Sequence, residues 1–193
     1  MNLNHLVDLS SRFVAALFAN ELSEKLSFHS AHHTQNVVIA TKEIGIHAGL
    51  TREELDLVTI AAWFHDTGYT KGYDGHEQLS VHIARDFLTE NGLEAQQIEC
   101  ITSCILATRF PQFPKNTLEM VLCDADFYHF SRNNYTEFEA SLRKEWEICL
   151  NLYYTDRQWN ALNYDMLKTH RYFTDYGQTV LQERKQKNIV KLK

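Results

Sequence analysis

Apolar residues recur every three or four positions along almost the whole chain, which is the spacing of one face of an α-helix. The first such stripe predicts a helix from Leu3 to about Leu26. Further helices are predicted over residues 30–47, 51–66, 76–89, 94–108 and 116–127, and two or three more follow. The pattern therefore predicts an all-α fold.

Capping residues mark several of these helix starts. Thr51 precedes Glu54 at the spacing of a capping box, and Thr155 precedes Gln158 in the same way. The segment 67–75 contains three glycines and is predicted to be a loop. The chain has only 2 prolines and 7 glycines among 193 residues, and few helix breakers agree with an all-helical protein.

No repeat, low-complexity linker or composition break divides the chain, so residues 1–193 are predicted to form a single domain. The net charge of −6 disfavours a surface that coats nucleic acid. No apolar run is long enough for a membrane span, and the start lacks a charged secretory signal, so a cytoplasmic protein is expected. The oligomeric state is not fixed by the sequence.

The four cysteines form no Cys-x-x-Cys pair and are interpreted as reduced core thiols. The tail 184–193 is basic against an acidic body. It is predicted to be a solvated, fraying helix end, with contact to a membrane surface as the alternative.

Histidines and acids of metal-ligand type fall on successive predicted helices. His29 and His33 are four residues apart and share a helix face, and His65-Asp66 ends the next long helix. If these helices form an antiparallel hairpin, His33 meets His65-Asp66. Asp124 and Asp126 lie in an otherwise apolar run, where a carboxylate needs a cation or a hydrogen-bond donor. The combination predicts a metal site.

The order His33, then His65-Asp66, then Asp126 resembles the HD-domain superfamily of metal-dependent phosphohydrolases, over about residues 28–130. The run from His65 to Glu77 is similar to bacterial stand-alone HD proteins and to HD modules that precede a membrane domain. The resemblance implies an HD-type helical bundle with a metal site in a helix-lined cleft. Residues 131–193 then supply C-terminal helices and the basic tail.

Carried over residue by residue, the resemblance makes His33, His65, Asp66 and Asp126 the metal ligands and leaves Asp124 to hydrogen-bond nearby. His29 matches a proton-donating histidine of the phosphodiesterase branch. Some HD enzymes hold a second metal through two further histidines. His76 suits the first position, but residues 105–109 contain no histidine for the second, so one divalent ion is expected. Mn, Fe, Co, Ni, Zn and Mg remain open, with a transition metal favoured by the histidine ligands.

The predicted function is hydrolysis of a nucleotide-like or other small phosphate ester by a metal-activated water. Asp66, His76 and His29 are the candidate catalytic residues, and Lys71 and Arg109 are candidates for substrate binding. Two alternatives stay open: a regulatory module that binds a nucleotide without turnover, and a structural metal domain. No role is predicted for His32, His47, His82, His129 and His170.

Overall fold

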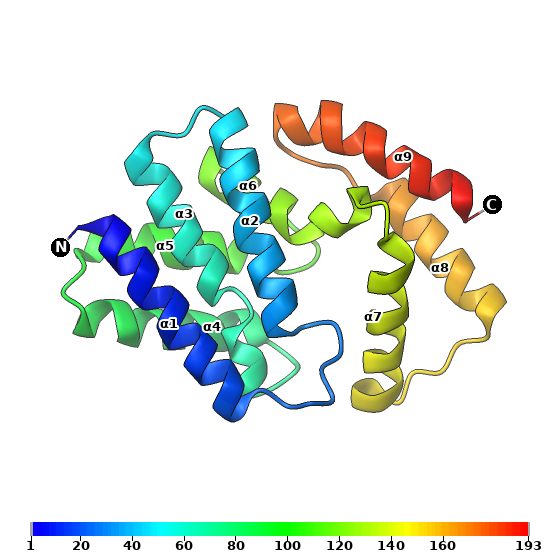
Figure 1. Ribbon diagram of the computed structural model, residues 1–193, viewed down its shortest axis with the longest axis horizontal. Helices are drawn as coiled ribbons and strands as arrows, with labels where there is room; N and C mark the ends of the chain where they lie inside the picture. Colours follow the sequence, from blue (N-terminus) through cyan, green and yellow to red (C-terminus); the bar gives the residue numbers. More distant parts are fainter. Residues whose placement is uncertain (1, 193) are drawn as a thin grey trace.

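The computed structural model describes residues 2–192, and the regular structure of that range is helical throughout (Figure 1). The all-α prediction is confirmed. The long helices are α1 (Leu3–Glu21), α2 (Ala31–His47), α3 (Arg52–Phe64), α4 (His76–Glu90), α5 (Ala95–Ala107), α6 (Thr117–Asp126), α7 (Tyr135–Leu150), α8 (Asp156–Thr169) and α9 (Gln182–Lys191). Three short turns lie between them: η1 (Thr67–Thr70), η2 (Phe127–Ser131) and the π-helical η3 (Gly177–Leu181).

The predicted caps fix the starts of the helices that matter for the site. Thr51 and Glu54 form both halves of a capping box at α3, and Thr155 and Gln158 do the same at α8. Ser30 caps α2, so the register that places His33 in the first turn is set by a local hydrogen bond.

The first helix is shorter than predicted. It ends at Glu21, and Leu22 is already extended with ψ near 130°. Leu26 and Phe28, each 7% exposed, turn inward to join the core. Their burial outweighs helix propensity in a segment that has no glycine or proline to signal the stop. The predicted loop 67–75 also contains one short helical turn, η1.

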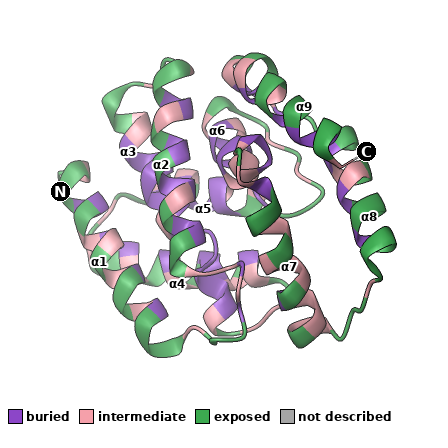
Figure 2. Ribbon diagram, turned by 45° about the vertical axis from the view of Figure 1, so that its right-hand side comes forward, coloured by how far each residue is buried: buried purple, intermediate pink, exposed green. Residues whose placement is uncertain are grey.

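The main hydrophobic core lies among α1 to α6, where apolar side chains of all six helices pack together. Figure 1 shows these helices grouped on one side of the molecule and α7, α8 and α9 on the other. A second, smaller cluster joins Phe130, Tyr135, Leu167 and Ile189. Buried positions are most frequent along α3 and α6, and α2 also carries many of them (Figure 2). The extent of the predicted domain, residues 1–193, stays a prediction.

The basic tail differs from the expectation of a solvated, fraying end. Residues 182–191 form helix α9, and Lys185 and Asn188 on it are buried. The Lys185 ammonium donates to the carbonyl of His170 at 2.7 Å, and Asn188 donates to the carbonyls of Phe130 and Arg132. These tertiary hydrogen bonds hold the tail as an ordered helix, and only its outer face carries exposed lysines. Within residues 2–192, no helix combines the length and apolar character needed to cross a bilayer.

Candidate metal centre and its cavity

Four side chains from three parts of the chain meet at one point. The Nε2 atom of His33, in the first turn of α2, lies 3.4 Å from Asp66 Oδ2 and 3.3 Å from Asp126 Oδ1. The Nε2 atom of His65 lies 3.2 Å from Asp66 Oδ2 and 3.8 Å from Asp126 Oδ1. His33, His65 and Asp66 are buried, and one ligand atom from each lies within 4.8 Å of the others.

The inward atoms of this cluster lack partners. Among residues 2–192, His33 Nε2, His65 Nε2 and Asp66 Oδ2 are buried without any partner in hydrogen-bonding geometry. Such atoms are costly unless something else satisfies them. The ring of His65 is held at its other nitrogen, where Nδ1–H can donate to the carbonyl of Ala62 at 2.8 Å. Two imidazole nitrogens and two carboxylates therefore fit a divalent cation.

Electrostatics favour positive charge at the same point. Burial lowers the pKa of His65, but the Asp66 and Asp126 carboxylates outweigh burial and raise it to about 9. Burial raises the pKa of Asp66, and the surrounding histidines overcome that effect and hold it well below its ordinary value. Carboxylates that stabilise a proton on His65 also stabilise a cation between the four side chains.

The position of His65 and Asp66 depends on a tight crossing between η1 and α4. The Ser80 hydroxyl donates to the carbonyl of His65 at 2.6 Å and accepts from the Gly68 amide at 2.8 Å. A Cβ atom built on Gly68 would lie 1.9 Å from the carbonyl oxygen of His76. Only glycine allows this approach, which brings the start of α4 against the end of α3.

Of the two acids at the end of α6, Asp126 faces the cluster and Asp124 does not. Asp124 is fully buried and accepts hydrogen bonds from the amides of Phe173 and Thr174 at 2.7 and 2.9 Å, and from the Thr174 hydroxyl at 2.7 Å. Asp124 thus anchors the segment between α8 and η3. These contacts agree with the expectation that Asp124 forms hydrogen bonds near the site. The role of Asp126 as a ligand stays a prediction.

His29 is held by a buried glutamate that the sequence did not single out. Glu145, on α7 and 0% exposed, lies 2.5 Å from His29 Nδ1 and accepts from the amides of Phe28 and His29 at 2.8 and 3.0 Å. The Tyr73 hydroxyl also donates to Glu145. Burial lowers the pKa of His29, but the Glu145 hydrogen bond and the charges of Asp66, Glu145 and Asp126 together outweigh burial and raise it. Glu145 therefore keeps a proton on His29 to higher pH.

His76 completes the group of histidines around Tyr69. The Tyr69 ring stacks against the rings of both His29 and His76, with centroid separations of 4.2 and 4.0 Å. His76 Nε2 lies 3.7 Å from Asp66 Oδ1, the oxygen that does not face His33 and His65. Both histidines thus border the cluster from fixed positions.

Lys71 and Arg109, the two residues predicted to bind substrate, do not line the cavity beside the cluster. The Lys71 ammonium forms an ion pair with Glu21 at 2.6 Å, and the side chains of both residues are about half exposed. Arg109 is exposed after the end of α5. The residues that line the cavity described next include neither of them. Their role in substrate binding stays a prediction.

A cavity of about 440 Å³ opens beside the cluster, and we refer to it as the aromatic chamber. Asp66, Asp126, His29 and His76 border it at one end. Its other walls are mostly aromatic and aliphatic side chains from η2, α7 and α8, among them Phe130, Phe138, Leu142, Trp146, Trp159 and Leu162. His129, for which no role was predicted, also lines the chamber, and burial lowers its pKa to about 3. His129 is therefore a neutral part of the wall.

Sequence reasoning missed Glu145, Tyr69 and the aromatic wall. Glu145 carried one usable signal, because it lies three residues after Leu142 and four before Cys149, on the apolar face of its helix. Tyr69 gave no signal beyond its place in the loop after Asp66.

Comparison with known proteins gives one match. The family model described as HD domain matches residues 30–131, which is more than half of the chain and includes all four residues of the cluster. No curated protein and no solved structure matches the chain.

Proposed function

This chain belongs to the HD domain family, and from that premise we propose that it is a metal-dependent phosphohydrolase of small phosphate esters, nucleotide-like or otherwise. One observation carries the proposal: buried, unpartnered atoms of His33, His65 and Asp66 converge beside a cavity. His33, His65, Asp66 and Asp126 would hold one divalent ion. Such an ion supplies a water of lowered pKa and counters the charge on a phosphoryl oxygen.

The protein's own residues are proposed to orient the substrate and move a proton. The attacking water gives up one proton to solvent, its oxygen becomes bonded to phosphorus, and the bond from phosphorus to the leaving oxygen breaks. His29 is the proposed donor of the proton that the leaving oxygen takes, because Glu145 favours its protonated form and because it lines the chamber. His76 is proposed to contact a phosphoryl oxygen beside Asp66. The four free cysteines support the cytoplasm, a reducing compartment, as the location.

The test is phosphate release from a panel of nucleotides and simple phosphate esters by the purified protein. We expect release that stops on chelation, returns on addition of Mn²⁺, and falls at least about a hundredfold in Asp66→Ala. His32→Ala is the matched control, because His32 is exposed on the same helix beside His33 and should keep full activity.

Two results would overturn the proposal. Thermal stabilisation by a nucleotide without any product would indicate a binding module. A tightly retained ion, with neither binding nor turnover of any phosphate ester, would indicate a structural metal site.

A further inference from the structure

Nearly half of the lining of the aromatic chamber comes from a segment that the family match does not include. Eleven of the 24 lining residues lie in 135–166, on α7, α8 and the connection between them, whereas the match ends at residue 131. Trp159, 2% exposed, packs edge-on against Trp146 with ring centroids 5.6 Å apart. The C-terminal helices therefore give this chain its own chamber next to a centre that the family shares.

Charge in the chamber is unfavourable for a substrate with several phosphates. Within residues 2–192, the chamber lining includes no lysine or arginine, but it includes four acids: Asp66, Glu77, Asp126 and Glu139. A divalent ion would cancel the charges of Asp66 and Asp126 only. One phosphoryl group can then lie at the ion, beside His29 and His76, but a second or third finds no lysine or arginine in the lining.

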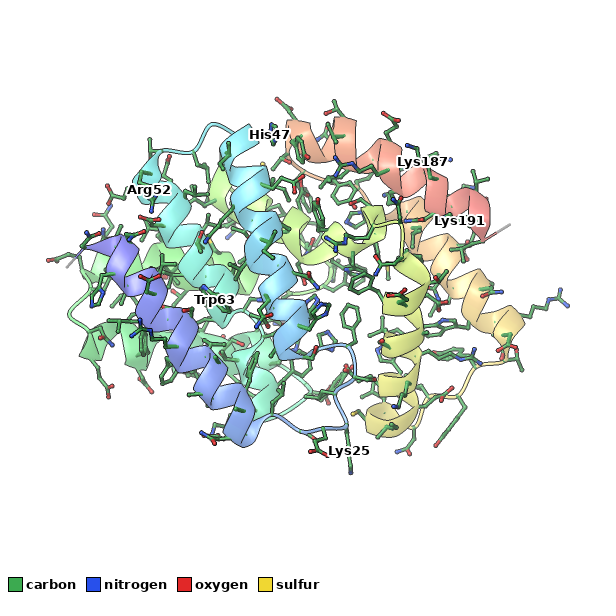
Figure 3. The ribbon with its side chains drawn as sticks, viewed as in Figure 1. Lys25, His47, Arg52, Trp63, Lys187 and Lys191 are labelled. Atoms are coloured by element: carbon green, nitrogen blue, oxygen red, sulfur yellow. The ribbon has the colours of Figure 1, made fainter. Side chains whose placement is uncertain are left out.

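A group of basic residues lines a second hollow. Arg132, Arg184 and Lys187 line a hollow against η2 and α9 that shares no lining residue with the chamber. Figure 3 shows Lys187 on the outer helix α9. Arg132 also lines a narrow hollow with His33 and Asp126. None of the three cations lines the aromatic chamber itself.

The polar groups in the far walls are already satisfied by one another. Asn163 accepts from the Tyr135 hydroxyl at 2.5 Å and donates to the carbonyl of Trp159 at 2.9 Å. Glu139 accepts from the Trp159 indole N–H. With these partners engaged, the walls present mainly ring faces and methyl groups. A ligand that needs many hydrogen bonds, such as a sugar, gains little there.

The rim of the chamber is apolar as well. Phe110, Leu152 and Leu162 belong to the lining and are 61%, 40% and 37% exposed. Exposed apolar groups at the opening of a cavity are typical of a binding site for an apolar ligand.

We propose that the aromatic chamber holds the leaving group of the substrate, and that this leaving group is a bulky, uncharged apolar ring system carried on a single phosphate. This inference rests on the proposed hydrolase activity and narrows it. It excludes sugar phosphates and nucleoside triphosphates as good substrates. A chamber of about 440 Å³ has room for a fused two-ring group.

The experiment compares kcat/KM for 2-naphthyl phosphate, phenyl phosphate, glycerol phosphate and adenosine triphosphate with the Mn²⁺-loaded protein. The first two differ only in one fused ring. We expect 2-naphthyl phosphate to be preferred over phenyl phosphate by at least about tenfold, because the extra ring buries apolar area in the chamber. Glycerol phosphate and the triphosphate should be poorer than both. Equal values for the two aryl esters, or a preference for the triphosphate, would overturn the inference.

Substitutions in the chamber lining test whether the preference for 2-naphthyl phosphate over phenyl phosphate arises there. Leu162→Arg and Leu152→Arg each place a cation on the partly exposed rim, where the fold tolerates it, and should reduce the naphthyl-to-phenyl ratio to near one. Ile148→Arg is the matched control, because Ile148 is 44% exposed on α7 and does not line the chamber. A ratio unchanged in both rim variants, or equally reduced in the control, would contradict the chamber as the binding site.

A binding measurement separates this inference from the proposed activity. Calorimetric titration with naphthylmethylphosphonate and benzylphosphonate, which cannot be hydrolysed, should give the same order of affinity and the same loss in Leu162→Arg. If no ester is hydrolysed but this order holds, the hydrolase proposal fails and the chamber's preference stands. If esters are hydrolysed without any preference for the larger ring, the inference fails and the hydrolase proposal stands.

Discussion

Glu145 is the residue that links the C-terminal helices to the histidines of the site. It accepts the hydrogen of His29 Nδ1 and two backbone amides, so it fixes both the protonation and the direction of that ring. Nothing in the local sequence pairs Glu145 with His29, because the contact spans 116 residues and exists only once α7 lies against the start of α2. By contrast, His33, His65 and Asp66 were predictable because helix spacing and a single hairpin bring them together.

Replacing this carboxylate should shift the pH dependence of the reaction. The pKa of His29 is raised above its ordinary value in the folded protein, so its protonated form persists to higher pH and is lost as pH rises through the raised pKa. In Glu145→Gln the charge is removed while the amide hydrogen bonds can remain. We expect the alkaline limb of the kcat profile to move to lower pH, with kcat reduced about tenfold.

The control is Glu147→Gln, the same change on the same helix at a residue that pairs with Arg143. It should keep the original profile. An alkaline limb that stays in place in Glu145→Gln would show that His29 is not the titrating donor.

At the scale of elements, the contact between η1 and α4 positions the centre. Helix starts were predictable from Thr51 and Thr155, because capping is a local interaction. The early end of α1 and the docking of α9 were not, because both depend on side chains that pack far away in sequence. The close approach of Gly68 to the His76 carbonyl was likewise not predictable, because it also depends on how separate elements pack.

Gly68→Ala should be strongly destabilising. Its Cβ would meet backbone atoms of His76 and Ser80, which cannot move without shifting α4, so we expect a loss of about 2 to 3 kcal/mol in the free energy of unfolding by urea. Gly72→Ala is the control in the same segment, since its Cβ would lie 3.5 Å from a Leu79 methyl group, an ordinary contact. Equal unfolding free energies for the two variants would contradict this view of the crossing.

At the scale of the whole molecule, different helices supply the proposed metal ligands and the apolar chamber. Helices α2, α3 and α6 bring the proposed ligands together, and α7 and α8 supply Glu145 and most of the apolar chamber. Motif order and family resemblance predicted that the proposed ligands come together. They did not predict the chamber, because aromatic residues on amphipathic helices have the same spacing whether they fill a core or line a cavity. Only the arrangement of the helices distinguishes the two.

The most direct test of the central claim is the metal content of the protein after loading with Mn²⁺ and desalting. Inductively coupled plasma mass spectrometry measures this content. We predict roughly one ion per chain in the wild-type protein and in His32→Ala, and a loss of that ion in His33→Ala and Asp126→Asn, each shown to be folded by its circular dichroism. Equal metal content in all four proteins, or none in the wild type, would contradict a cation held between α2, α3 and α6.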